Sequence, residues 1–108
     1  MTQVNIDVVN GVTVVSVSGH AGYSNDGKDI VCSAISTITQ SLLQTLKYYQ
    51  QQGKCRILSE NIAEDAGAVL FSFKSSATSE TDALMSMAQM GYLMLEKSYP
   101  KNISVNIN

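Results

Sequence analysis

The dipeptide Asn10-Gly11 stands between two runs of β-branched residues and restricts the fold more than any other feature of the chain. Both residues tolerate positive φ, which a type I′ turn requires, so the pair is a strong hairpin signal. Strands are predicted over residues 3–9 and 12–18, where apolar side chains alternate. A two-residue loop fixes their register. The predicted pairs are Val9 with Val12, Val8 with Thr13, Ile6 with Val15 and Val4 with Val17. The apolar side chains of both strands therefore share one face.

The remaining elements follow from periodicity and stop signals. Apolar residues at steps of three and four predict a helix from about 29 to 52, which Gly53 ends. Two further strands, 54–60 and 68–73, are predicted to pair antiparallel around a turn within 63–67. A final strand with alternating Ile103, Val105 and Ile107 follows the only proline. With a second helix before that proline, the order is ββαββαβ, an α+β fold with a mixed or antiparallel sheet packed against two helices.

The second helix is predicted to begin near Ser79, where Ser79 to Asp82 fits a capping box, and to end before Pro100. Its methionine-rich apolar stripe is interpreted as a deformable face of the core. The stripe consists of Leu84, Met87, Ala88, Gly91, Met94 and Leu95.

Composition restricts the class of protein. The 108 residues suffice for one domain, 1–108, with one core. A net charge of -2 gives no general attraction to nucleic acid or to an acidic membrane. The N-terminus has no signal-like leader and no stretch is long enough to span a membrane, which predicts a cytoplasmic protein. Two cysteines and one histidine form no metal-ligand pattern, so no metal is expected.

The histidine, His20, and the first cysteine, Cys32, lie twelve positions apart on either side of a glycine-rich loop. His20 ends the second predicted strand. Cys32 falls in the first turn of the predicted helix, roughly 100° from the centre of its apolar stripe. There, unpaired backbone N–H groups and the helix dipole stabilise a thiolate, and the same groups are suited to an oxyanion. The pattern favours Cys32 as a nucleophile and His20 as its general base.

Each of these residues also has a purely structural interpretation. Cys32 fits a small hydrophobic residue and His20 a solvated residue at a strand end. Asp29 either orients His20, as the third group of a triad does, or only caps the helix. Spacing alone leaves these alternatives open. Cys55, which begins a strand without a histidine nearby in sequence, is interpreted as structural.

Two blocks, Gly19-His20-Ala21-Gly22 and Lys28-Asp29-Ile30-Val31-Cys32-Ser33-Ala34-Ile35-Ser36, resemble the signature of the ribosomal-processing cysteine protease family, Prp. The order of strands and helices is similar over the whole chain, although Ser33 replaces a usual small residue such as alanine. The resemblance implies a cysteine endopeptidase that removes a short N-terminal extension from a bacterial large-subunit ribosomal protein precursor. It implies His20 and Cys32 as catalytic residues, with Asp29, Gly19 and Ser36 in support.

The same resemblance implies a homodimer without metal or organic cofactor, and a flexible substrate loop over the active site. That loop runs from Ala21 to Lys28 and includes Ala21, Gly22, Tyr23, Ser24, Gly27 and Lys28.

Two other functions remain open. One is a non-catalytic module that binds a peptide at a sheet edge, in ribosome assembly for example. The other is a protease of phage capsid or scaffold precursors.

Overall fold

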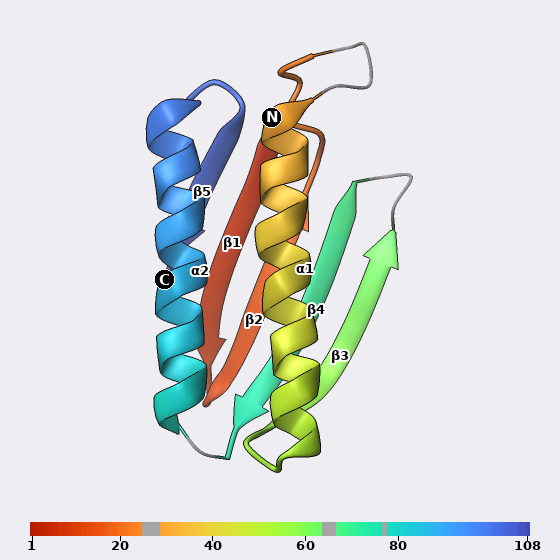
Figure 1. The fold of residues 1–108 in the computed structure, drawn as a ribbon, viewed down its shortest axis with the longest axis vertical. Helices are drawn as coiled ribbons and strands as arrows, with labels where there is room; N and C mark the ends of the chain where they lie inside the picture. The colour runs from red at the N-terminus through yellow and green to blue at the C-terminus, as the bar shows by residue number, and fades with distance from the viewer. Residues whose placement is uncertain (25–28, 64–66, 77) are drawn as a thin grey trace.

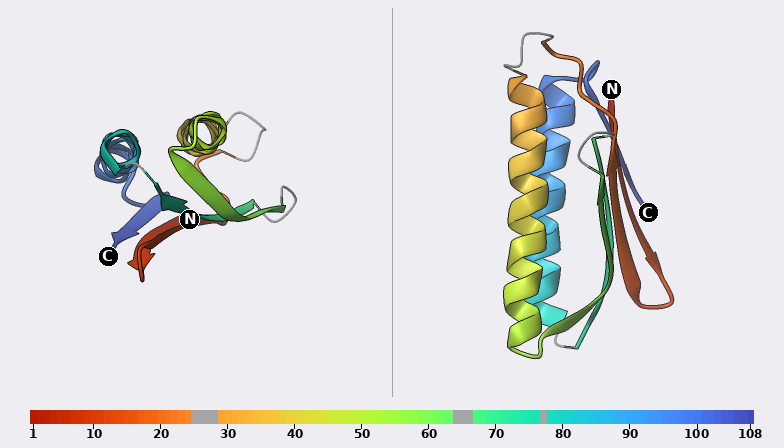
Figure 2. Two further views of the ribbon diagram at one scale, coloured as in Figure 1. Left: turned by 90° about the horizontal axis from the view of Figure 1, so that it is seen from below. Right: turned by 90° about the vertical axis from the view of Figure 1, so that its right-hand side faces the viewer.

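The computed structural model describes residues 1–24, 29–63, 67–76 and 78–108 (Figure 1). Their order is the predicted ββαββαβ. The elements are β1 (Thr2–Val9), β2 (Val12–Ser18), α1 (Ile30–Gln51), β3 (Cys55–Ala63), β4 (Ala68–Ser75), α2 (Thr78–Ser98) and β5 (Ile103–Ile107). The strands form one mixed sheet, and both helices pack on the same face of it (Figure 2).

The β1–β2 hairpin has the predicted register, with Val4 opposite Val17 and Ile6 opposite Val15. Asn10 and Gly11 both have positive φ, 52° and 78°, as a type I′ turn requires. The local turn chemistry and the apolar pattern of the strands therefore select the same pairing.

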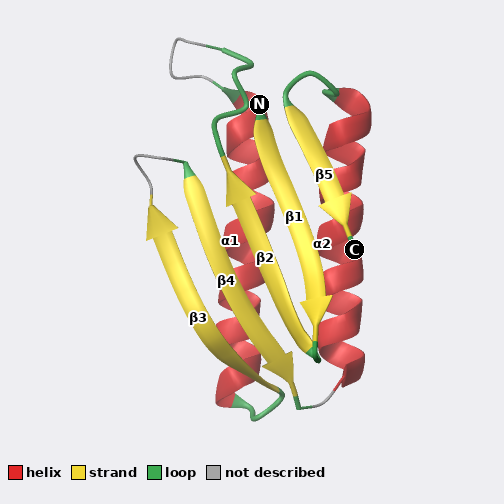
Figure 3. Cartoon of the chain, turned by 180° about the vertical axis from the view of Figure 1, so that it is seen from behind, coloured by secondary structure: helices red, strands yellow, loops and turns green. Residues whose placement is uncertain are grey.

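The sheet has the strand order β3-β4-β2-β1-β5 (Figure 3). β3 pairs antiparallel with β4, as predicted, and β4 pairs antiparallel with β2. β5 lies parallel to β1, and α2 provides the crossover that brings the chain back beside the first strand. The last residues of the chain thus lie beside the first.

This topology gathers several chain segments at one rim of the sheet, at the top of Figure 1. β2 ends there, whereas β1, β5 and β4 begin there, because β1 and β4 run antiparallel to β2 and β5 runs parallel to β1. The first turn of α1 lies at the same rim. The end of the second strand and the start of the first helix are therefore neighbours.

The core lies between the helices and the sheet and combines the predicted faces of the hairpin and of α1. Its largest fully buried side chains include Tyr92, Phe71 and Phe73, Ile6 and Leu42. The Tyr92 hydroxyl lies 2.7 Å from Thr39 Oγ1, so a buried hydrogen bond joins the two helices.

Two predictions for α2 are wrong. The helix begins at Thr78, so Ser79 lies inside the first turn and its hydroxyl donates to Glu80 Oε2 instead of capping the helix. Met87 and Met94 are 67% and 63% exposed and do not face the core. The rest of the stripe includes Ala88, which is buried, and Leu84 and Leu95, which pack against the core, as expected. α2 also buries Thr81, Met85 and Tyr92. Within the described ranges, neither helix is long and apolar enough to cross a membrane.

Candidate active site

Asp29 is the N-cap of α1. Its Oδ1 accepts hydrogen bonds from the backbone N of Val31 at 3.0 Å and of Cys32 at 2.9 Å. Its Oδ2 accepts from Tyr23 N at 3.0 Å. One carboxylate therefore caps the start of α1 and also holds the backbone of Tyr23, which precedes the helix in the chain.

These contacts bear on the two roles considered for Asp29. Burial raises the pKa of its carboxyl, but hydrogen bonds from Cys32, Tyr23 and Ser24 outweigh burial and hold the pKa below its ordinary value. In the described part of the chain, the hydrogen bonds of this carboxylate do not go to His20. The geometry supports capping. Because Val31 N and Cys32 N already donate to Asp29, neither is free to bind an oxyanion, contrary to expectation.

Cys32 lies in the first turn of α1, half-buried at the edge of the core. Its Sγ accepts a hydrogen bond from the backbone N of Ala21 at 3.2 Å. Ala21 directly follows His20, so this bond connects the end of β2 to the first turn of the helix. The Ala21 backbone N–H is therefore aimed at the Cys32 sulfur.

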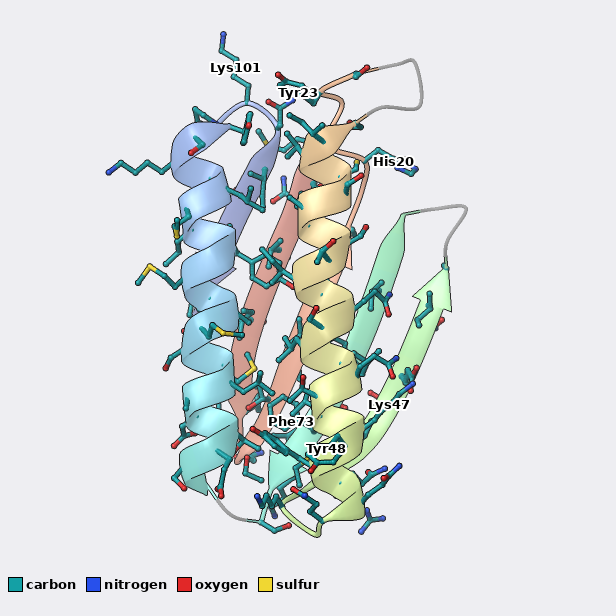
Figure 4. All side chains as sticks on the ribbon, in the orientation of Figure 1. His20, Tyr23, Lys47, Tyr48, Phe73 and Lys101 are labelled. Atoms are coloured by element: carbon teal, nitrogen blue, oxygen red, sulfur yellow. The ribbon has the colours of Figure 1, made fainter. Side chains whose placement is uncertain are left out.

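His20 follows β2 and its side chain is exposed. Figure 4 shows it beside the first turns of α1, on the side of β4. Gly67, which precedes β4, lies against its ring: a Cβ on Gly67 would stand 3.0 Å from Cε1. The imidazole is therefore bordered by the turn before β4.

His20 and Cys32 line one cleft of about 510 Å³ between α1 and the sheet. Ser36, one turn beyond Cys32, and Gln40, one turn further, extend its wall along α1. The opposite wall is mostly apolar and includes Ile62 and Val69. Within the described ranges, no three His, Cys, Asp or Glu side chains gather as metal ligands would. The cleft thus presents a thiol and an imidazole beside an apolar wall.

The supporting residues have identifiable contacts. Gly19 has φ +87°, and a Cβ there would lie 2.7 Å from Met1 O, so only glycine fits. Ser36 lines the cleft. The predicted substrate loop begins with a fixed residue, because Ala21 is 2% exposed. The Tyr23 ring packs edge-on against Tyr99 at 5.5 Å.

Gly22 and Ser24 also lie in the described part of this loop, and Gly22 has φ +71°. Gly27 and Lys28 lie outside the described residues.

Three residues near His20 and Cys32 were missed by sequence reasoning: Thr2, Gly67 and Asn102. Thr2 Oγ1 donates to Gly19 O at 3.1 Å, and Asn102 Nδ2 donates to Ala21 O at 3.0 Å. No local pattern marks them. Parallel pairing of β1 with β5 brings Thr2 and Asn102 to this rim, and Gly67 lies there because it directly precedes β4. Cys55 is buried, and its thiol donates to Leu46 O at 3.3 Å, in agreement with a structural role.

Comparison with known proteins places this chain in a family of proteases. The model of one family, described as cysteine protease Prp, matches residues 1–104. A solved structure of the ribosomal processing protease Prp from S. aureus, with a covalently linked product peptide, is 22% identical with a TM-score of 0.82, and all of both chains is covered. The same S. aureus protease with a substrate peptide is 24% identical with a TM-score of 0.74, again over all of both chains.

SMU.848 from Streptococcus mutans is 25% identical with a TM-score of 0.75, over 99% of this chain and 93% of that chain. No curated protein matches the chain. The solved structures agree with the strand and helix order described above.

Proposed function

The chain belongs to the cysteine protease Prp family, and we propose that it removes a short N-terminal extension from the precursor of a bacterial large-subunit ribosomal protein. The observation that carries this proposal is the placement of His20 and Cys32 in one cleft at the start of α1. The S. aureus Prp proteins of the same fold are described as ribosomal processing proteases and hold substrate and product peptides. Those descriptions supply the substrate class.

In the first half of the reaction, His20 takes the proton of the Cys32 thiol. The Sγ electron pair then attacks the carbonyl carbon of the scissile peptide bond, and the C=O π electrons move to oxygen. When the tetrahedral species collapses, the C=O bond re-forms and the C–N bond breaks. The leaving amine takes its proton from the His20 imidazolium, and the N-terminal extension remains as a thioester on Cys32.

In the second half, water attacks the thioester carbonyl and gives a proton to His20. Collapse of that intermediate breaks the C–S bond and releases the extension with a new carboxyl end, while the proton on His20 returns to sulfur. The bond from Ala21 N to Sγ stabilises the sulfur anion that leaves in this step. Asp29 contributes by holding the helix start in place.

We also propose a cytoplasmic homodimer. A run of exposed apolar side chains on α2 supports self-association, because surfaces of this kind are commonly covered by a partner. These side chains are Met87, Met90, Leu93 and Met94. Sedimentation equilibrium of the purified protein tests the dimer, and a concentration-independent monomer mass would exclude it.

The test of the function is cleavage of a peptide that spans the N-terminal extension of such a ribosomal precursor, read by mass spectrometry. Wild type, Cys32→Ala, His20→Ala and Cys55→Ser are compared. Cys55→Ser keeps a donor for Leu46 O and is a matched control for a cysteine outside the cleft. We expect wild type and Cys55→Ser to cut at one bond and the other two variants to be inactive.

The alternative functions predict different results in the same assay. A non-catalytic binding module leaves the peptide intact and binds it equally well with all four proteins. A protease of phage capsid or scaffold precursors ignores the ribosomal peptide but retains a reactive Cys32.

A further inference from the structure

The backbone on both sides of His20 is anchored by side chains from distant parts of the chain. Before it, the Gly19 carbonyl accepts a hydrogen bond from Thr2 Oγ1 at 3.1 Å. After it, the Ala21 carbonyl accepts from Asn102 Nδ2 at 3.0 Å. The Ala21 N–H is used as well, since it donates to Cys32 Sγ at 3.2 Å. His20 is thus enclosed between two fixed residues.

The two anchoring residues are themselves joined. Thr2 N donates to Asn102 O at 2.9 Å, where parallel strands β1 and β5 begin. Asn102 N in turn donates to Tyr99 O, which closes the turn after α2. Thr2 is 2% exposed and Asn102 is half-buried. The side-chain donors are therefore held by backbone bonds, and their hydrogen bonds to Gly19 O and Ala21 O are partly buried, which strengthens them relative to fully exposed ones.

We propose that Asn102 and Thr2 are positioning residues that fix the Gly19–Ala21 backbone, so that His20 and the Ala21 N–H are presented to Cys32. The inference rests on the proposed roles of Cys32 and His20. His20 is exposed, and Gly67 borders one side of its ring. Its position therefore depends largely on the backbone that carries it. Preorganisation of this kind acts on the chemical step rather than on substrate binding.

Asn102 is the more informative of the two, because the chain offers a matched control. Asn106 also donates through Nδ2 to a partner 101 positions away, Asn5 Oδ1 at 3.2 Å, but this pair is exposed and lies away from the cleft. Asn102→Ala and Asn106→Ala therefore each remove one long-range amide hydrogen bond, of ~1 kcal/mol. Only the first releases the Ala21 carbonyl.

The first measurement is steady-state cleavage of the ribosomal precursor peptide at a temperature where both variants are folded by circular dichroism. We expect Asn102→Ala to lower kcat by about five- to tenfold with KM within about twofold of wild type. Asn106→Ala should match wild type in both constants. A kcat for Asn102→Ala equal to that of Asn106→Ala would overturn the proposal.

The second measurement does not need the substrate. It follows the rate at which iodoacetamide alkylates Cys32 at about pH 7, with the site identified by mass spectrometry. We expect this rate to fall by about three- to fivefold in Asn102→Ala, because the Ala21 N–H that donates to Cys32 Sγ is no longer held in place, and to be unchanged in Asn106→Ala. Equal alkylation rates in the two variants would contradict the proposal.

Thr2 provides a test that does not depend on the folding of the Asn102 variant. Thr2→Val keeps the shape of the buried side chain and removes the hydroxyl that holds Gly19 O, whereas Thr2→Ser keeps that hydroxyl. We expect Thr2→Val to lower kcat and Thr2→Ser to restore most of it. Equal loss in both variants would show that only packing matters. If wild type does not cut the ribosomal peptide but Asn102→Ala still slows the alkylation of Cys32 as expected, the substrate assignment fails and the positioning roles stand.

Discussion

Gly67 lies directly against the imidazole of His20: a Cβ on residue 67 would stand 3.0 Å from Cε1 and 3.2 Å from each ring nitrogen. Gly67 also has φ +61°, a conformation that side chains disfavour. The turn before β4 thus leaves room for the ring only because residue 67 has no side chain. This contact connects the β3–β4 hairpin to the residue proposed as general base.

Gly67→Ala is expected to displace the His20 ring and to lower kcat by at least about tenfold, because small misplacements of a base have large kinetic effects. The control is Gly11→Ala, which has a similar φ of +78° but open space around the added methyl group. Both variants should lose ~1 kcal/mol of stability, whereas only the first should lose activity. Equal kcat values for the two variants would exclude this role of Gly67.

Asp29→Ala is expected to lower the free energy of unfolding by ~1 kcal/mol at neutral pH, since it removes the cap of α1. The pKa of Asp29 lies below its ordinary value of 3.8, so the ionised form is favoured in the folded protein. Its contribution is therefore complete above that value and is lost as pH falls through the lower folded pKa. Urea unfolding at about pH 7 and about pH 3 measures this contribution. The difference in free energy of unfolding between wild type and Asp29→Ala should be smaller at the acidic pH. A difference in free energy of unfolding that is larger at acidic pH would contradict the role of ionised Asp29 as the cap of α1.

Tyr92→Phe tests the buried hydrogen bond between the two helices. Removal of the hydroxyl that lies 2.7 Å from Thr39 Oγ1 should destabilise the protein by ~1 kcal/mol at neutral pH. Burial raises the pKa of Tyr92 to about 12, against a smaller lowering by the bond with Thr39. The contribution of the neutral phenol is thus present below the ordinary value of 10.0 and lost as pH rises toward 12. Urea denaturation at a series of alkaline pH values measures this effect. The free energy of unfolding should fall less with rising pH in Tyr92→Phe than in wild type.

The two cysteines are expected to differ in reactivity. Burial raises the pKa of the Cys55 thiol, which also donates to Leu46 O inside the core. Iodoacetamide should therefore modify Cys32 in the native protein and reach Cys55 only after unfolding. Peptide mapping by mass spectrometry distinguishes the two sites. Native modification of Cys55 at a rate comparable to that of Cys32 would mean that the core opens there.

Local chemistry explains which parts of the fold were predictable. The Asn10-Gly11 turn and the alternating strands fix one register, and the structure confirms it. Asp29 was predicted as N-cap, and it accepts hydrogen bonds from two amides of the first turn. Each of these features depends on residues within a few positions of one another. The hairpin register and the helix N-cap can therefore be predicted from the sequence alone.

Features that depend on tertiary contacts were missed or misplaced. The predicted apolar stripe of α2 included Met87 and Met94, which are exposed, whereas Thr81 is buried because its hydroxyl forms a hydrogen bond with Ser75. Asn102 meets Ala21 only because β5 pairs with β1, and no spacing rule predicts a contact between residues 81 positions apart. The sequence pointed to His20 and Cys32, which line one cleft, whereas it did not point to Thr2 and Asn102, which hydrogen-bond the backbone beside His20.

The most direct test of the central claim is detection of the thioester intermediate. The protein is mixed with the precursor peptide, quenched in acid and digested, and the digest is analysed by mass spectrometry. We predict an adduct with the mass of the N-terminal extension on the peptide that contains Cys32, at a level that rises and then falls during turnover, and no adduct in Cys32→Ala. Cleavage of the peptide by Cys32→Ala, or turnover by wild type with an adduct elsewhere, would contradict the assignment of Cys32 as the nucleophile.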